Sequence, residues 1–310
     1  MTAPTFQENV GVKLVYGAES TFGTQSGATG QYLRRVSSTL ALAKDILASN
    51  EVRPDQEQND VRHGARRVTG AIQGELSRTT YDDLIAAALR NTWSTNEVAT
   101  AVLRPSFTIE QIHPTLDISE VFLGCRIADM SVSMQPGAVA TIGFSVMGQN
   151  MTTASGAGSP VFASPVAAPT TGVMAGPNGS LSIDGVASTV VTGLDFTVTN
   201  NLSGPPVVGS NIVPEIFYGR RQVSGTVSAF FTDLTLLNAY LNETTIKISV
   251  TVTAPDSTTM SFHFNRVKLN GGAKTVGPDG GVIMAFPFQS LLATSIAGDA
   301  DGSLVIERSA

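Results

Sequence analysis

The sequence predicts a mainly β protein with short helices, built as two tandem β-sandwich domains related by internal duplication. Three observations lead to this prediction. Apolar and polar residues alternate over several stretches, which is the period of a strand with one buried face. Only 14% of the residues are charged, which suits a chain whose surface is largely covered by other subunits. Three blocks of sequence recur in the same order in both halves.

The first recurring block is an alternating strand. It reads "RVTGAIQGELS" in the first half and "QVSGTVSAFFT" in the second, and Val68 corresponds to Val223 at an offset of 155 residues. Apolar residues point to one side of each strand. The polar residues that alternate with them include Thr69, Gln73, Glu75, Ser224, Thr226 and Ser228.

A leucine- and alanine-rich run follows each strand and predicts a short helix in each half. The two runs are "TTYDDLIAAALRNTW" and "LTLLNAYLNET". Asp82 and Asp83 suit the positive end of the first helix dipole. The second run lacks this acidic pair.

The last recurring block predicts a hairpin. "CRIADMSVSMQPGAVATIGFSVMGQ" aligns without a gap with "NRVKLNGGAKTVGPDGGVIMAFPFQ", at an offset of 140 residues. Between the halves, a stretch rich in Ala, Ser, Gly and Pro predicts a linker. We therefore expect an extended N-terminal arm at 1–31, a first domain at 32–149, a linker at 150–179 and a second domain at 180–310.

Composition and motifs argue against several functions and favour a structural role. The net charge of −6 disfavours non-specific binding to phosphate backbones. Cys125 is the only cysteine, and we expect it to be a buried small hydrophobe. The three histidines lack partners at metal-ligand spacing, and no nucleophile, phosphate-loop or dinucleotide motif occurs. We expect no enzyme, no metal and no cofactor.

The sequence also bears on location. No basic region followed by an apolar core marks a secretory signal at the N-terminus. No apolar run approaches the roughly 20 residues that a membrane-spanning helix needs. We therefore expect a soluble protein, made in a cytoplasm, without a membrane anchor.

The first half resembles a known family from about Gly17 to Trp93. "VYGAESTFGT" and "SNEVRPDQEQNDVRHGARRVTGAIQGELSRTTYDDLIAAALRNTW" are similar to the tail tube proteins of long-tailed bacteriophages, mostly those with non-contractile tails, the siphovirus type. The resemblance implies tail-tube-like domains, six of which close a ring whose inner strands join into one barrel. With two domains in each chain, it implies homotrimeric rings of pseudo-sixfold symmetry, stacked into a hollow conduit for DNA.

The resemblance also implies partners and a place. The partners are other copies of the chain, the tape-measure protein, the tail terminator, and distal tail or tail-tip proteins. Viral double-stranded DNA passes through the lumen without specific binding. The place is the tail tube of the virion, made and assembled in the host bacterial cytoplasm.

Two sets of residues are candidate functional sites. Because a conduit must not bind its cargo, its wall should be polar or acidic. The lumen-facing candidates are Thr69, Gln73, Glu75, Ser224, Thr226, Ser228 and Asp129. The subunit-contact candidates are the two arginine pairs and the acidic pair, namely Arg66, Arg67, Arg220, Arg221, Asp82 and Asp83.

Three alternatives stay open on sequence alone. The polar strand faces could belong to an outer, solvent-facing sheet. The chain could be a distal tail or tail-completion protein, which forms one ring and stops. It could also be a tandem β-sandwich binding module of adhesin type, which would be a monomer with an exposed ligand face.

Overall fold

The computed structural model describes residues 6–27, 29–188, 190–232, 234–276, 280–294 and 301–309, so residues 1–5 and 28 of the predicted arm lie outside it. The fold is mainly β, as predicted. The elements of the first half are η1 (Asn9–Gly11), β1 (Lys13–Ala18), β2 (Gln31–Tyr32), β3 (Ser37–Ser38), β4 (Ala41–Ala48), β5 (Val61–Glu75), α1 (Asp82–Leu89), β6 (Glu97–Ala99), β7 (Phe107–His113), β8 (Ile118–Met134), β9 (Thr141–Gly148) and β10 (Asn150–Ser155). Those that follow are η2 (Gly156–Gly158), η3 (Gly176–Asn178), β11 (Gly179–Ile183), β12 (Val186–Ser188), β13 (Val191–Thr199), β14 (Gln222–Phe230), α2 (Thr235–Leu241), β15 (Ile246–Thr253), β16 (Thr259–Leu269), β17 (Ala273–Thr275), β18 (Ile283–Ser290) and β19 (Val305–Arg308).

Each half has the same order of neighbouring strands. The order is β1–β7–β8–β9–β5–β4 in the first half and β11–β15–β16–β18–β14–β13 in the second. All of these pairings are antiparallel. The two predicted helices form where expected, because α1 follows β5 and α2 follows β14. This shared order is the topology that two copies of one domain would have.

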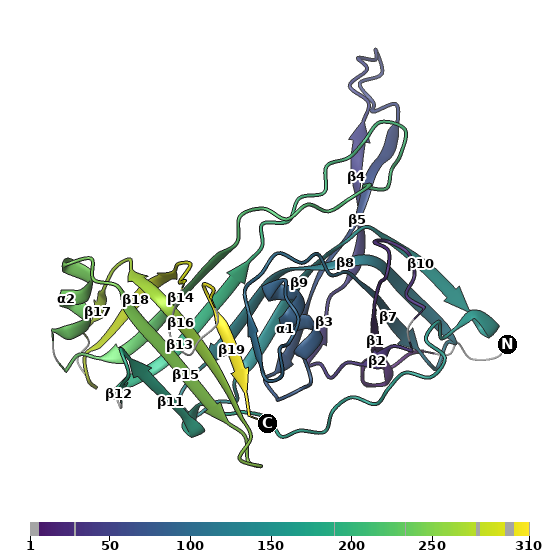
Figure 1. Ribbon diagram of the computed structural model, residues 1–310. Coiled ribbons are helices and arrows are strands. Elements are labelled where there is room, and N and C mark those ends of the chain that lie inside the picture. Colours follow the sequence, from purple (N-terminus) through teal and green to yellow (C-terminus); the bar gives the residue numbers. More distant parts are fainter. Residues whose placement is uncertain are drawn as a thin grey trace.

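The two halves join edge to edge. The C-terminal part of β8 pairs with β13, from Asp129 opposite Thr199 to Met134 opposite Leu194. One continuous sheet results, in the order β4–β5–β9–β8–β13–β14–β18–β17, and we call it the shared sheet. Figure 1 shows it crossing the molecule, with β4 and β5 at one end and β17 and β18 at the other.

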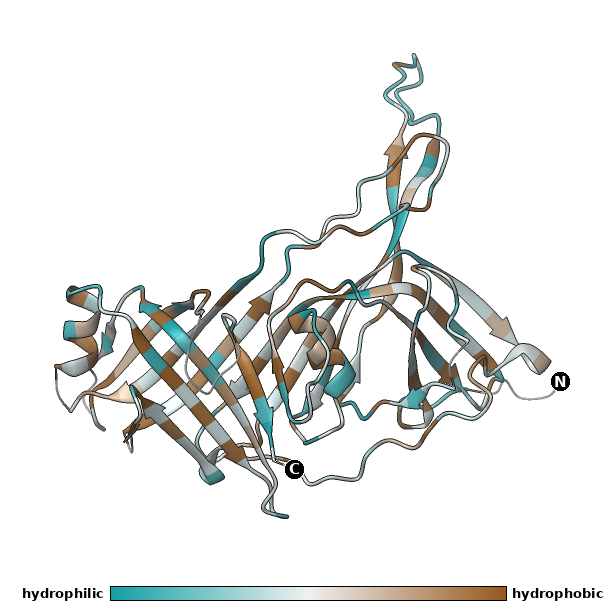
Figure 2. Cartoon of the chain, in the orientation of Figure 1, coloured by the Kyte–Doolittle hydropathy of each residue, from teal (hydrophilic) through white to brown (hydrophobic). Residues whose placement is uncertain are grey.

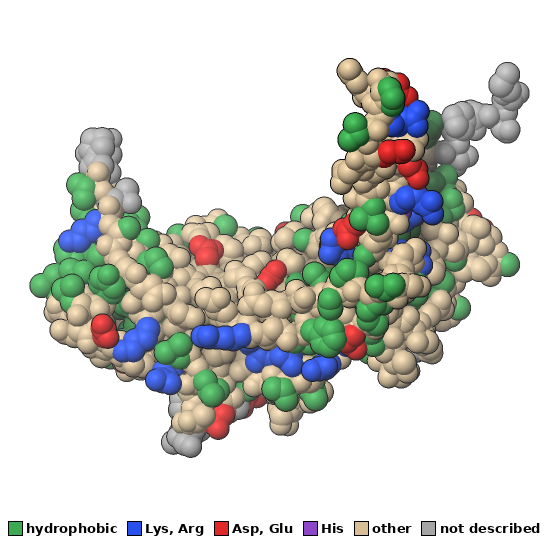
Figure 3. Space-filling model, turned by 90° about the horizontal axis from the view of Figure 1, so that it is seen from above, with side chains coloured by type: hydrophobic (Ala, Val, Ile, Leu, Met, Phe, Trp, Pro, Cys, Tyr) green, Lys and Arg blue, Asp and Glu red, His purple; other side chains and the backbone are tan. Residues whose placement is uncertain are grey.

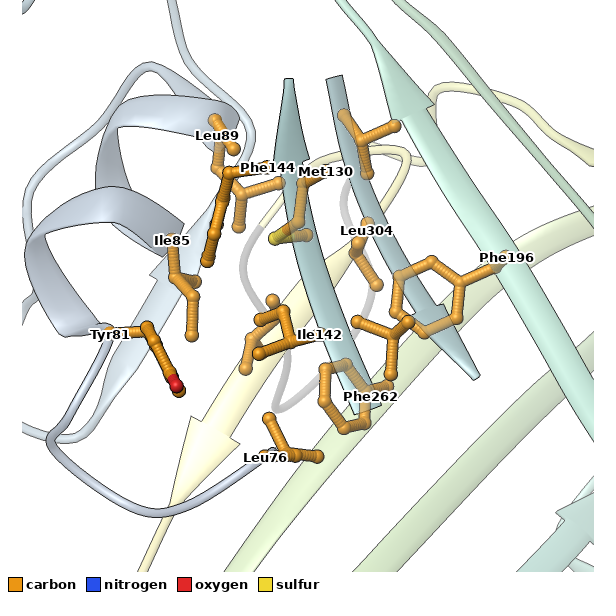
Figure 4. Packing of buried hydrophobic residues seen from close by; sticks show 14 of the residues in the cluster. Leu76, Tyr81, Ile85, Leu89, Met130, Ile142, Phe144, Phe196, Phe262 and Leu304 are labelled. Carbon is orange, nitrogen blue, oxygen red and sulfur yellow. The ribbon is translucent and has the colours of Figure 1, made fainter. Parts of the chain in front are cut away.

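One hydrophobic core spans both halves. Leu76, Tyr81 and Ile85 of the first half and Phe196 and Phe262 of the second belong to the same cluster of buried side chains. Figure 4 shows residues from both halves in this packing. Each fully buried side chain of this size contributes roughly 1.5–3 kcal/mol to folding. The predicted domains therefore share a core rather than folding around two separate ones.

Period-2 patterning accounts for how the strands pack. In β15, buried and partly exposed residues alternate without a break from Ile246 to Thr253. Figure 2 shows the same pattern as alternating apolar and polar bands along the strands of the second half. The apolar side of each strand is buried because successive side chains point to opposite faces of a sheet.

The N-terminal segment differs from the predicted extended arm. From Lys13 it forms β1, which pairs with β7, and Leu14, Val15 and Tyr16 are buried. The apolar run that makes this strand is only a few residues long, so its periodicity is too short to reveal a strand. The segment is thus part of the first half rather than a separate arm.

The predicted linker also differs in part. Residues Asn150–Ser155 form β10, which pairs with β8. Further along, the carboxylate of Glu110 accepts hydrogen bonds from the backbone N–H groups of Val161 (2.7 Å) and Phe162 (3.0 Å). Met174 donates its backbone N–H to Leu76 at 2.9 Å. The segment is therefore fixed against the first half, because backbone polar groups that leave water need such partners.

Candidate functional site

The side of the shared sheet that faces away from the core carries a continuous polar surface, which we call the polar face. Its side chains form three rows of residues that lie directly opposite one another on neighbouring strands. The first row is Glu75, Thr141, Ser133, Asp195, Thr226 and Pro287. The second is Gln73, Gly143, Ser131, Thr197, Ser224 and Gln289. The third is Ala71, Ser145, Asp129, Thr199 and Gln222.

Strand alternation separates this face from the core. On β14, Val223 and Val227 are buried, while Ser224 and Thr226 between them are partly exposed on the polar face. Gly225 sits where two neighbours come close: a Cβ atom there would lie 2.4 Å from the backbone oxygen of Asp195. Because glycine has no Cβ atom, β13 and β14 can pair closely here, and Asp195 keeps its place on the polar face.

Asp195 sits at the centre of the polar face, beside the junction between the halves. Its Oδ1 accepts a hydrogen bond of 2.5 Å from the hydroxyl of Ser133, and its Oδ2 accepts one of 3.0 Å from Nε2 of Gln135. Both donors belong to the first half, whereas Asp195 belongs to the second. Charge-assisted hydrogen bonds of this kind are the stronger ones, so Asp195 holds the two halves in register on this face.

The charge of the polar face is acidic. Glu75, Asp129 and Asp195 are the charged residues of the three rows as far as β18, and Lys268 of β16, which lies opposite Gln289, adds one cation at the end of the second row. Next to the rows on β5, Arg67 is paired with Asp45 of β4 at 2.7 Å, which offsets its charge. Figure 3 shows a broad surface of mainly uncharged side chains, with isolated acidic ones, between two projections; other charged side chains gather on the β4–β5 projection and along one rim. The rows therefore present hydroxyl and amide groups with isolated negative charges.

A depression of about 520 Å³ lies on the polar face. Its lining includes Gln73 of the first half and Ser224 and Thr226 of the second. The described residues contain no group of three or more His, Cys, Asp or Glu side chains placed to hold a metal ion. No helix in the described part of the chain is long and apolar enough to cross a membrane.

All seven lumen-facing candidates lie on one side of the shared sheet. Gln73, Glu75, Ser224, Thr226 and Asp129 belong to the three rows. Thr69 lies one row further along, opposite Met147, and Ser228 lies opposite Gly193 and Ala285. The structure thus brings together residues that the sequence places in separate halves.

Sequence reasoning missed Asp195, Thr197 and Gln289 on the same face. The signal for the first two is present, because "TGLDFTVTN" alternates as β14 does. Because β13 matches its first-half counterpart only loosely in sequence, this alternation alone does not place its polar residues on the same face as those of β14. Only the pairing of β13 with β8 places these side chains beside the others.

The subunit-contact candidates have partners within their own chain. Arg67 pairs with Asp45, Asp82 with Arg308, and the Asp83 carboxylate accepts a hydrogen bond from the Tyr16 hydroxyl. The Arg66 backbone N–H donates to Asn211, and the Arg220 carbonyl accepts from Asn201. Arg221 donates to the carbonyl of Ala101 at 2.6 Å. Their role in subunit contacts stays a prediction.

Burial lowers the pKa of the Arg221 side chain. The side chain is largely removed from water, and Arg90 adds a second positive charge nearby. Burial first, and this neighbour second, lower the pKa of Arg221 to about 10. A guanidinium with that pKa is still charged at neutral pH, so its hydrogen bond to Ala101 remains charge-assisted.

The acidic residue of "ESTFGT" has a structural role that the sequence did not reveal. The Glu19 carboxylate accepts hydrogen bonds from the backbone N–H groups of Gly23 (2.9 Å) and Gly124 (2.8 Å). It also accepts them from the hydroxyls of Ser106 (2.7 Å) and Thr108 (3.0 Å). One carboxylate thus fixes the loop after β1 onto β7 and β8.

A family model described as phage tail tube protein matches residues 10–291, which is nearly the whole chain. No curated protein matches the sequence.

Proposed function

The chain belongs to the phage tail tube protein family, so it is a structural subunit of a virion tail, and we propose that its polar face lines the channel of the tube. The observation that carries this proposal is the continuity of the polar face across the β8–β13 junction. An unbroken face of this kind is expected where every domain presents the same side to one cargo.

The chemistry of the polar face suits a wall past which DNA slides. Proteins hold duplex DNA mainly through lysine and arginine contacts to phosphates, which release bound counterions. The three rows offer one such cation, Lys268 opposite Gln289, whereas the three acidic residues Glu75, Asp129 and Asp195 repel phosphates. Serine, threonine and glutamine side chains bind water instead. The role of this surface is non-enzymatic.

We infer that the two halves are copies of one domain and that three chains close a ring of pseudo-sixfold symmetry. The common strand order of the halves supports the duplication. The β8–β13 junction supports the ring, because it is a contact between one domain and the next that leaves the shared sheet continuous.

Such rings would stack into a hollow tube. In this proposal the tape-measure protein occupies the channel during assembly, and DNA replaces it during ejection. The tail terminator and the distal tail or tail-tip proteins contact the two ends of the tube. Assembly takes place in the host bacterial cytoplasm.

Electron microscopy of the purified protein, with light scattering of the same sample, tests this function. We expect trimers that convert into stacked rings or hollow tubes as the protein concentration rises. A stable monomer at all concentrations, even with tail-tip proteins added, would contradict the proposal. Single rings that never stack would instead indicate a distal tail or tail-completion role.

A further inference from the structure

The shared sheet ends in two strand edges that have no partner in the part of the chain that the structure describes. On one edge β4 pairs only with β5, and on the other β17 pairs only with β18. Such edges present unpaired backbone N–H and C=O groups to which another strand can add. The two edges lie at opposite ends of the sheet, so they cannot meet within one copy (Figure 1).

The β8–β13 junction inside the chain shows how two such edges can pair, and we use it as a template. In this comparison, β4 of the first half corresponds to β13 of the second half. Thr197 of β13 lies opposite Ser224 of β14, just as Ala41 of β4 lies opposite Thr69 of β5. Ser224 and Thr69 are corresponding residues of the recurring strand. Ala41 is therefore the counterpart of Thr197.

At the other edge of the shared sheet, β17 of the second half corresponds to the C-terminal part of β8 in the first half. Gln73 of β5 and Ser228 of β14 are corresponding residues of the recurring strand. From each of them, a series of directly opposite residues runs across the next two strands of its half. The two series are Gln73–Gly143–Ser131 and Ser228–Ala285–Ala273. Ala273 of β17 is therefore the counterpart of Ser131 of β8.

In the junction, Thr197 lies opposite Ser131. We propose that β4 of one copy pairs antiparallel with β17 of the next copy, with Ala41 opposite Ala273. This inference rests on the proposed function, in which copies of the chain form a ring, and it names the edges and the register that close it. A head-to-tail contact repeated around an axis closes a ring and leaves no free edge.

Apolar surface around β17 supports this partner. Phe230, Leu241 and Val276 are 44%, 65% and 75% exposed. A cavity of about 410 Å³, lined mainly by apolar residues of β11, β12, β14, β18 and α2, opens in the same region. Exposed apolar surface of this extent is typical of an interface.

The corresponding region of the first half is already covered. The residues of α1 from Leu84 to Leu89 are all buried, whereas α2 has no buried residue. The second half contributes to the burial of α1, where Nδ2 of Asn200 donates a hydrogen bond of 2.9 Å to the carbonyl of Ala88. A following copy would cover the α2 region as the second half covers α1.

Paired cysteines test the register. The double variant Ala41→Cys/Ala273→Cys places two thiols opposite one another across the proposed contact, because directly opposite Cβ atoms are about 4.5–5.5 Å apart. Both alanines are exposed, and the native Cys125 is buried. After mild oxidation, a denaturing gel without reductant should show covalent dimers and trimers.

Two matched controls accompany this variant. Ser131→Cys/Thr197→Cys places thiols at the equivalent position inside the chain, so it should form a disulfide and stay at the monomer position on the gel. Ala48→Cys/Ala273→Cys has the same exposed residue types out of register, so it should yield little covalent oligomer. Each single variant should assemble as the unmodified protein does.

The outcomes separate this inference from the function on which it rests. Rings or tubes seen by electron microscopy, without a disulfide between Ala41→Cys and Ala273→Cys, would overturn the register and leave the tube function standing. An out-of-register disulfide that forms equally well would also overturn it. Failure of the unmodified protein to form any ring would overturn both.

Discussion

The hydroxyl of Ser133 donates a hydrogen bond of 2.5 Å to the carboxylate of Asp195, across the line where the two halves of the chain meet. This contact lies within a row of side chains that crosses the sheet from Glu75 to Pro287. It shows that the halves share one surface as well as one core. In the proposed function, this surface rather than any cluster of reactive groups is the functional feature of the protein.

Reversing the charge of the polar face should create DNA binding. Tubes of Glu75→Lys/Asp129→Lys, which leave the junction contact of Asp195 intact, should retain a short fluorescent DNA duplex about tenfold more than unmodified tubes at low salt, because each lysine adds a phosphate contact. The retention should fall steeply as salt rises. Co-sedimentation of the duplex with the tubes measures it.

A charge-matched control makes this result specific to the face. Glu57→Lys/Asp117→Lys adds the same charge at exposed positions outside the three rows. If both double variants retain the duplex equally, the effect is one of net charge, and the polar face is not the DNA-facing wall.

Gly225→Ala should destabilise the fold. A Cβ atom at this position would lie 2.4 Å from the backbone oxygen of Asp195, so β13 must move away from β14. We expect a loss of about 1–3 kcal/mol in the free energy of unfolding. Urea unfolding followed by circular dichroism measures it. Gly158→Ala, where a Cβ atom would meet nothing within 4 Å, should leave the free energy nearly unchanged.

Glu19→Ala should loosen the segment after β1. The change leaves the four hydrogen-bond donors of Glu19 without their acceptor, two of them backbone N–H groups. We expect a loss of about 2–4 kcal/mol in unfolding free energy, since hydrogen bonds to a charged group are worth about 1.5–3 kcal/mol each and water replaces part of them. Glu8→Ala, at an exposed position, is the control. Equal urea midpoints for the two variants would contradict this role of Glu19.

Cys125 should be unreactive in the folded protein. Burial, and secondarily the charge of Glu19, raise the pKa of its thiol, so the reactive thiolate is scarce at neutral pH. Because the folded pKa lies above the unfolded one, the thiol's contribution to stability is present below the unfolded pKa and is lost as pH rises above it. A chromogenic disulfide reagent at pH 8 should react only after urea unfolds the chain. Fast reaction before unfolding would contradict the burial.

Much of the fold follows from the sequence because alternation is a strong local signal. Val68, Ile72, Val223 and Val227 are buried on the sides that the period of two assigns to them. The acidic start and apolar spacing of α1 predict that helix in the same way. These features depend on residues close together in the chain, so the printed sequence contains them.

The remaining features depend on pairing over long distances. Nothing local to "KLVYGA" indicates that β1 adds to β7, and nothing local to Asp195 indicates that it meets Ser133. The ungapped hairpin alignment also misses the structural register. With Val68 opposite Gly148 and Val223 opposite Ser290, the matching residues lie two positions further along than that alignment puts them. A shift of two positions cannot be seen in the sequence pattern, because it leaves the alternation of both strands unchanged.

A helical reconstruction of the assembled protein by electron cryomicroscopy tests the central claim most directly. The measurement is the position of the Gln73–Ser131–Thr197–Ser224 row relative to the tube axis. We predict that this row faces the central channel and that the shared sheet continues from one copy to the next without a gap. A map in which the row lies on the outer surface, or is buried between stacked rings, would contradict the account.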